Sequence, residues 1–514
     1  MTYFETLLLI LLAAILLLQV TRRLALPYPS VLAVAGVAMG LIPGAPSFAI
    51  DPPTALALFI APALLDAAFD FQFRAVKRLW KPLFALAVVA VLVTTAVVAW
   101  IGWRFAGLPL AAAVALGAIV APPDAAAATA SLGNVSLPRR TLAVLKGESL
   151  LNDATALLLF GVALSAQGYE TDAVRSVGLR LLVAAPGGVV LGIAFAWIYR
   201  YIARYVTGTL GGNLLEFVVT FWVWILADRL GLSAVLCVVA FAMTLARIAA
   251  PHQRPRVRVH SFAVWDAVVF LLNVLAFLIM GMQARRIIGE MEAQPLQQAL
   301  RFALIVVVGV IVTRLAIVLF YNFLARRFPT RHGTSEAASL RHSLLVGWSG
   351  MRGLVTLATA FALPAAFPQR SLIVLSAFAV VLATLVVQGL TLTPLIRLLG
   401  LDRDDTAERE LVSARKHMAR AALAALQGHD GPEAEATRYF YRVEAEAISD
   451  RKQQPVFDRH RELGLIAVRA ERAALRALQR EMKVGSEAFL VLQEGLDWKE
   501  LALLSETDSQ IEQS

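Results

Sequence analysis

Residues 147–160 read Gly-Glu-Ser-Leu-Leu-Asn-Asp-Ala-Thr-Ala-Leu-Leu-Leu-Phe, a stretch apolar enough to cross a bilayer that still carries two carboxylates. The two acids are Glu148 and Asp153. An ionised carboxylate at the centre of a membrane helix costs about 2.5–3.5 kcal/mol on insertion scales. We therefore expect each acid to face protein, water or an ion rather than lipid.

The polar residues of this stretch fall on one face of the helix that its composition predicts. Ser149, Asn152 and Asp153 stand at positions i, i+3 and i+4, which share a face of an α-helix. A hydroxyl, an amide carbonyl and a carboxylate are hard oxygen ligands that suit a small cation. Glu148 lies just off this face and needs a positive partner of its own. Ser and Asn also join membrane helices by hydrogen bonds, so a packing role for Ser149 and Asn152 stays open.

The composition predicts an all-α polytopic membrane protein. Hydrophobic residues make up 59% of the chain, and the mean hydropathy is +0.69, both outside the range of soluble domains. The single cysteine, Cys237, excludes a disulfide framework, and the sequence contains no H-E-x-x-H zinc motif and no Walker A motif. We expect no cofactor and no enzymatic activity. The net charge of +10 is concentrated in the apolar part, where it indicates membrane topology rather than binding to nucleic acid.

About thirteen apolar segments are long enough to cross a bilayer. They lie near residues 4–21, 27–43, 52–70, 82–104, 109–132, 141–165, 177–200, 213–229, 231–249, 261–282, 299–324, 341–363 and 371–399. The sequence past Leu401 is charged and rich in alanine, and its spacing predicts amphipathic helices. We therefore divide the chain into a transmembrane domain, residues 1–401, and a helical cytoplasmic tail, residues 402–514.

Basic residues are concentrated in alternate loops, for example at Arg22 and Arg23, Lys77 and Lys81, Arg200 and Arg204, and Arg326 and Arg327. Cytoplasmic loops are the ones enriched in Lys and Arg. This pattern predicts a multi-pass protein of the plasma (inner) membrane, with the amino terminus outside and the carboxyl terminus in the cytoplasm.

Two of the predicted spans are interrupted. The fifth contains Pro122-Pro123-Asp124, which removes two backbone donors and places Asp124 to cap a second half-helix. Unwound backbone at membrane depth lines a cavity or is buried in protein, and its carbonyl oxygens can bind cations. The twelfth contains Gly350-Met351-Arg352-Gly353, and a guanidinium at this depth requires an acid. We predict that Arg352 pairs with Glu148, which leaves Asp153 available to exchange its ligand.

The two interrupted spans are seven apart, the spacing expected of inverted repeats with an ion site where two discontinuous helices cross. The third span adds Asp66, within Leu64-Leu65-Asp66-Ala67. Contact with the ion, a gate, a proton relay and helix packing all remain open as roles for Asp66.

These motifs resemble the monovalent cation/proton antiporters of the electroneutral NhaP/NHE type, in their bacterial form. The resemblance rests on Gly147 to Asp153, on Pro122-Pro123-Asp124, on Leu64 to Ala67 and on Gly350 to Gly353, and these motifs spread over most of residues 1–400. It implies core and dimerisation bundles in a homodimer and a role in sodium and pH homeostasis. The residue before the aspartate of the broken helix is often threonine in this family, whereas here it is Pro123, which offers only its backbone carbonyl.

The resemblance also implies a role for each site residue. Asp153 is expected to bind Na⁺ and H⁺ in turn, Ser149 to contribute an oxygen, and Asp66 and Asp124 to lie close to the ion. Asn152 is expected to stabilise the broken helices, and Glu148 with Arg352 to form a structural ion pair. Family members with asparagine at the position of Asn152 are generally electroneutral, which implies one ion for one proton.

Competition between ion and proton gives this arrangement a mechanism. A desolvated carboxylate takes up a proton more readily than one in water, so the site holds either a proton or a cation. A gradient of one species then drives the other as one helix bundle moves against a second. The alternatives are a passive cation channel with the same oxygen ligands and an antiporter selective for K⁺; Li⁺ is a further candidate ion.

Overall fold

The computed structural model describes fourteen stretches of the chain. They are residues 3–24, 26–42, 51–69, 71, 73–132, 139–166, 171–206, 210–248, 255–289, 291, 296–327, 339–401, 406–449 and 454–504. Some predicted positions lie outside these stretches. They include the span ends at residues 43, 70 and 249, and residues 402–405 and 505–514 of the predicted tail. The regular elements within them are all helices, as the sequence predicts.

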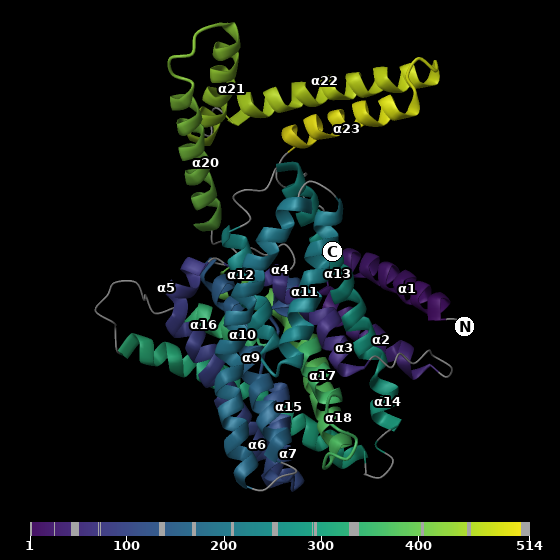
Figure 1. Cartoon of the computed structure of the whole chain (residues 1–514), viewed down its shortest axis with the longest axis vertical. Coiled ribbons are helices and arrows are strands. Elements are labelled where there is room, and N and C mark those ends of the chain that lie inside the picture. The colour runs from purple at the N-terminus through teal and green to yellow at the C-terminus, as the bar shows by residue number, and fades with distance from the viewer. Residues whose placement is uncertain are drawn as a thin grey trace. The chain divides into compact units, whose positions relative to one another are not determined.

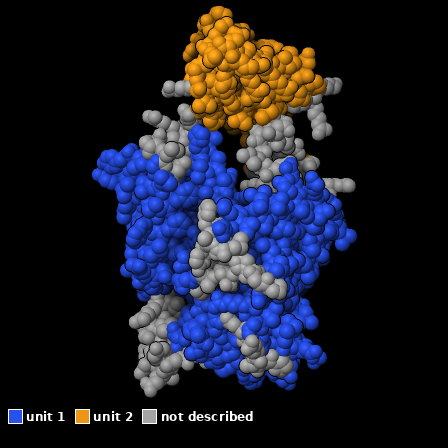
Figure 2. Space-filling model, turned by 90° about the vertical axis from the view of Figure 1, so that its right-hand side faces the viewer, with its two compact units in different colours: residues 1–403, 514 blue, residues 404–513 orange. Residues whose placement is uncertain are grey.

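The chain forms two compact units, coloured separately in Figure 2: residues 1–403 together with 514, and residues 404–513. The boundary lies two residues beyond the predicted one. The first unit contains the apolar helices, whose course can be followed in Figure 1.

The described helices of the first half of this unit include two short π-helical segments, each of which continues a longer helix. The elements are α1 (Tyr3–Leu24), α2 (Tyr28–Leu41), α3 (Pro52–Ala55), η1 (Leu56–Ile60), α4 (Ala61–Phe69), α5 (Phe73–Phe84), η2 (Ala85–Val89), α6 (Ala90–Ala106), α7 (Leu110–Val120), α8 (Ala125–Leu132) and α9 (Arg139–Ala166). Those of the second half are α10 (Thr171–Val206), α11 (Leu210–Arg229), α12 (Ala234–Ile248), α13 (Pro255–Met282), α14 (Ala284–Gly289), α15 (Leu296–Arg327), α16 (Leu340–Trp348), α17 (Leu354–Phe361), α18 (Arg370–Ala383), η4 (Thr384–Gln388) and α19 (Gly389–Leu399).

Each of the thirteen predicted spans coincides with a helix or with consecutive helical pieces. Among the described residues, seven helices are long and apolar enough to cross a membrane, and three shorter apolar helices join them: Tyr28–Leu41, Pro53–Phe69 and Ala234–Ile248. The all-helical, multi-pass architecture is thus confirmed, whereas the count of thirteen crossings stays a prediction.

Both predicted interruptions are present. Helix α7 ends at Val120 and α8 begins at Ala125, and α16 ends at Trp348 and α17 begins at Leu354. The backbone N–H of Asp124 donates to the carbonyl oxygen of Met351 at 2.7 Å, so the two breaks lie against each other. Prolines account for the first break because they lack N–H donors.

Small residues allow α2 and α13 to pack with their backbones in close approach. A Cβ atom added at Gly281 would collide with the backbone of α2 at Ala33 and Gly36, and one added at Gly36 would collide with Leu278 and Gly281. This close approach is typical of membrane helix pairs, in which small residues replace the hydrophobic driving force. The pair therefore depends on these two glycines.

The second unit consists of α20 (Thr406–Ala425), α21 (Pro432–Ser449), α22 (Gln454–Arg480) and α23 (Ser486–Leu503). Helices α22 and α23 pair through a small core of Val468, Leu475 and Leu496. Arg472 bridges to Asp497 at 2.9 Å beside this core. The helical tail expected from the sequence is present within the described part of residues 402–514.

We predict that Gly281→Ala lowers the free energy of unfolding by about 1–3 kcal/mol, because the added methyl group forces α13 away from α2. Gly161→Ala is the matched control, since a Cβ there meets nothing within 4 Å. The control should be neutral or stabilising, as alanine is the better helix former. Thermal unfolding midpoints of the purified variants measure the difference, and equal shifts in both variants would contradict this packing.

Candidate ion-binding site

Helix α9 brings the polar face predicted from the sequence into the protein interior. Asn152 is fully buried, and Asp153 is 6% exposed. Among the described residues, Asp153 has neither a hydrogen-bond nor an ion-pair partner. A buried carboxylate without a partner is costly in any protein and more so in a membrane helix. Asp153 is therefore a candidate for binding a positively charged ligand.

Two side chains of α9 attach it to the break between α7 and α8. The amide nitrogen of Asn152 donates to the carbonyl oxygen of Pro123 at 2.8 Å. The hydroxyl oxygen of Ser149 accepts from the backbone N–H of Ala125 at 3.3 Å. The amide oxygen of Asn152 is buried and has no partner within the described chain. It remains available as a neutral oxygen ligand beside Asp153.

Asp124 caps the second half-helix, as the proline break predicts. Its Oδ1 accepts the N–H of Ala126 at 2.8 Å and that of Ala127 at 3.4 Å. These bonds satisfy two of the free donors at the start of α8. Its Oδ2 lies against Gly353, where a Cβ atom would have no room. The negative charge of Asp124 is close enough to act on Asp153.

The predicted ion pair between Glu148 and Arg352 is wrong. Glu148 pairs instead with Arg314 of α15, whose two terminal nitrogens donate to its two carboxylate oxygens at 2.6 and 3.0 Å. Both side chains are buried, and the paired geometry is the strong bidentate form. The guanidinium of Arg314 occupies the space that a side chain at position 350 would need, which explains Gly350.

Arg352 is held by backbone carbonyl groups. Its Nε donates to Val120 at 3.1 Å, and its terminal nitrogens donate to Ala121 at 3.5 Å and to Gly350. The last carbonyls of a helix lack intrahelical donors, and the two prolines after Ala121 supply none. Three hydrogen bonds from the guanidinium meet this need, which is the physical reason that Arg352 is turned to the broken backbone. The carbonyl of Ala121 is thus already bonded.

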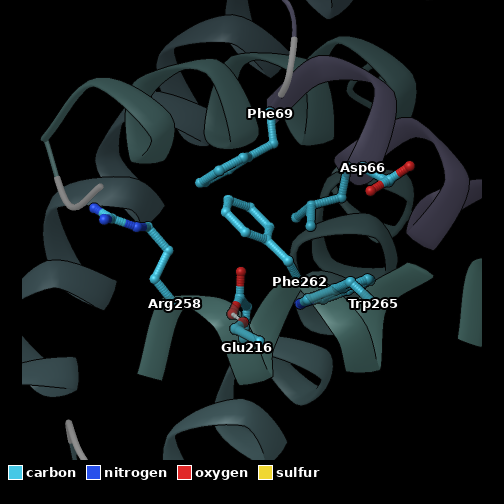
Figure 3. Close-up of a pocket in the computed structure, with 8 residues that line it drawn as sticks. Asp66, Phe69, Glu216, Arg258, Phe262 and Trp265 are labelled. Atoms are coloured by element: carbon cyan, nitrogen blue, oxygen red, sulfur yellow. Dashed lines mark hydrogen bonds between the residues drawn. The ribbon is translucent and has the colours of Figure 1, made fainter. Parts of the chain in front are cut away.

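Asp66 lines a cavity whose other lining residues do not include Asp124 or Asp153. The cavity has a volume of about 30 Å³ and is lined by Leu65, Asp66, Phe69, Glu216, Arg258, Ser261, Phe262 and Trp265 (Figure 3). Glu216 belongs to α11, and the last four residues belong to α13. A direct role for Asp66 at the ion stays a prediction.

Residues from α9 and from the break between α7 and α8 make up the candidate site. Asp153, Asn152 and Ser149 come from α9, and Pro123 and Asp124 come from the break itself. Within the described residues, no three His, Cys, Asp or Glu side chains come together as a ligand group. A cation here would combine one or two carboxylates with neutral oxygens, a donor set suited to an alkali ion rather than to zinc.

The sequence alone does not identify the partner of Arg314, and it does not single out Glu216. The available signal for Arg314 was its depth in a predicted span, since an intramembrane arginine must be paired. Glu216 offered the same signal, because a lone glutamate lies in the first third of an apolar helix. In both cases the partner is distant in sequence, and only the folded chain brings the groups together.

The fold and this site define a multi-pass membrane transporter for small cations. The family described as "Sodium/hydrogen exchanger, transmembrane" matches residues 7–398. The chain belongs to this family of sodium/hydrogen exchangers, as the resemblance of its motifs implies. The family consists of transporters rather than enzymes.

Relatives and a solved structure agree with this assignment. An uncharacterized Na⁺/H⁺ exchanger of Mycobacterium tuberculosis is 33% identical and covers 77% of this chain and 75% of its own. A sodium, potassium, lithium and rubidium/H⁺ antiporter of Bacillus pumilus is 28% identical over 91% of this chain and 73% of its own. The sodium proton antiporter MjNhaP1 of Methanocaldococcus jannaschii, 20% identical, has the same fold with a TM-score of 0.58 over 77% of this chain and 98% of its own.

We predict that Glu148→Leu alone loses about 3–5 kcal/mol of stability, because it leaves the guanidinium of Arg314 buried and unpaired. Adding Arg314→Met should recover part of this loss by removing the stranded charge. Adding Arg352→Met should recover none. The yield of monodisperse protein and its melting temperature measure the loss of stability and its recovery. Recovery with Arg352→Met instead would show that the pairing described here is incorrect.

Proposed function

We propose that this protein exchanges Na⁺ for H⁺ and that both bind in turn to Asp153. The observation that carries this proposal is that no described residue pairs with a carboxylate that is 6% exposed in a membrane helix. A permanently empty, ionised Asp153 would destabilise the protein. A proton or a cation removes that charge, and the two cannot occupy the carboxylate together.

The surroundings of Asp153 support a cation as one of its ligands. The unpaired amide oxygen of Asn152 and the hydroxyl oxygen of Ser149 lie on the same face of α9. The carbonyl of Pro123 and Oδ2 of Asp124 complete a candidate donor set at the break. We assign Na⁺ as the principal ion, and K⁺ and Li⁺ as further candidates, because the B. pumilus relative is named for all three.

The bonding of Asp124 favours an electroneutral cycle. Two N–H donors of α8 hold its carboxylate, and hydrogen bonds of this kind stabilise the ionised form. In the cycle that we propose, these bonds keep Asp124 ionised throughout against the effect of its burial, and Asp153 alone changes ligand. One proton is exchanged for one cation, and no net charge crosses the membrane.

Movement of the site between the two sides completes the proposal. The helices that carry the breaks would move as one bundle against a second bundle. The family resemblance implies that this second bundle forms the dimer interface of a homodimer. From the loop charges we propose that the amino terminus lies outside and the carboxyl terminus in the cytoplasm of the cell. The exchange would serve sodium and pH homeostasis.

We predict that Asp153→Asn abolishes Na⁺-dependent dissipation of a pH gradient in membrane vesicles, because an amide can neither release a proton nor neutralise a cation. Asp228→Asn is the matched control, since Asp228 is exposed at the end of α11. It should leave the rate unchanged. Exchange at the normal rate in Asp153→Asn would rule out Asp153 as the shared site.

The balance point of exchange tests the stoichiometry. In proteoliposomes, a tenfold Na⁺ gradient should be balanced by a pH gradient of about one unit at every membrane potential. Each net charge per cycle would instead add about 2.3 kcal/mol per 100 mV and move the balance point. A balance point that shifts with potential would exclude 1:1 exchange. A current that ignores an opposing pH gradient would indicate a passive cation channel.

A further inference from the structure

The carboxylate of Glu216 is buried and is not used by the mechanism proposed above. It is 8% exposed on α11, and the hydroxyl of Ser261 donates a hydrogen bond to it at 3.3 Å. Within the described chain, Glu216 has no ion-pair partner. It faces the cavity that Asp66 also lines (Figure 3). The cavity therefore contains an acid whose charge the described protein does not neutralise.

A second buried group is directed into the same cavity. Trp265 is 5% exposed, and its indole N–H has no hydrogen-bond partner among the described residues. Figure 3 shows the indole nitrogen turned toward Glu216. Unsatisfied buried donors are uncommon and indicate a water molecule or ligand at the position they face. A volume of about 30 Å³ accommodates a small ion or water.

Two features of the lining support a cation as the ligand of this cavity. Ser261 and Trp265 present donors to Glu216, and donors of this kind stabilise the ionised carboxylate. The rings of Phe69 and Phe262 lie over the cavity, and aromatic faces attract cations. The guanidinium of Arg258 is directed away from Glu216 in Figure 3 and does not pair with it.

The position of the cavity connects it to the exchange site. Asp66 lies on the wall opposite Glu216, and its carboxylate is turned away from Glu216. Its helix, α4, packs against α9, where Leu64 and Leu65 share a core with Leu150 and Ala154. Ala154 is the neighbour of Asp153. The wall of the cavity that carries Asp66 is thus packed directly against the helix that carries Asp153.

We propose that Glu216 is a second binding site for the transported monovalent cation, occupied on its way between Asp153 and the side of the basic loops. This inference rests on the exchange function proposed above. The cation would be bound by the carboxylate of Glu216 and the oxygen of Ser261, with the indole N–H of Trp265 held by water or by the carboxylate. It would be a weaker site than Asp153, because Glu216 lies nearer the end of its helix.

Transport from the two sides tests this site. In oriented vesicles, Glu216→Gln should raise the apparent KM for Na⁺ about five-fold from the side of the basic loops, which is the effect of losing one partly solvated charge contact. The KM from the opposite side and the maximal rate should not change. Asp228→Asn on the same helix is the matched control and should alter neither. Unchanged KM values in Glu216→Gln, or equal shifts on both sides, would overturn the proposal.

A binding measurement separates this inference from the exchange proposal. In the Asp153→Asn background, Tl⁺ should quench part of the tryptophan fluorescence in a saturable way, and adding Trp265→Phe or Glu216→Gln should remove that part. Quenching that is unaffected by both additions would refute a cation at Glu216. Exchange retained by Asp153→Asn would refute only the assignment of Asp153. If Glu216→Gln does not yield monodisperse protein, Glu216→Asp and Ser261→Ala replace it. Each should raise the KM in the same direction by a smaller factor. An unchanged KM in both variants would contradict the site.

Discussion

The structure depends on how a membrane protein satisfies backbone that cannot be helical. Pro122 and Pro123 deprive α7 of the donors that would continue it, and no water is present in a bilayer core to replace them. Arg352 donates to the carbonyls at the end of α7, and Asn152 donates to that of Pro123. The Asp124 carboxylate accepts from the start of α8. The break is therefore held open as a defined arrangement of oxygen atoms.

Charge pairing around the break determines which acid is left available. Glu148 is neutralised by Arg314, and Asp124 is held by backbone donors. Asp153 is the acid of α9 to which the described structure gives no partner. The arrangement thus separates two tasks that one carboxylate could not perform, since a group tied to a fixed cation cannot exchange its ligand. Our proposal for Glu216, which also has no ion pair among the described residues, extends this logic to a second point on the route of the cation.

The parts of the account that the sequence predicted are local ones. Prolines and glycines located both breaks, the spacing of Ser149, Asn152 and Asp153 defined their common face, and Asp124 was correctly identified as a cap. The partner of Glu148 could not be predicted, because Arg314 is 166 residues away and Arg352 lies at a similar depth. Hydropathy does not distinguish two buried arginines. Hydropathy also predicts the lengths of the spans, but it does not show that acids on separate spans, such as Asp66 and Glu216, line the same cavity.

Proton release on cation binding tests the central claim most directly. Purified protein in weakly buffered detergent solution is titrated with NaCl, and the released protons are counted with a pH indicator. If one carboxylate holds either species, Na⁺ should displace up to one proton per chain in the wild type and none in Asp153→Asn. Saturable Na⁺ binding to the wild type without proton release, or equal release from Asp153→Asn, would contradict the account.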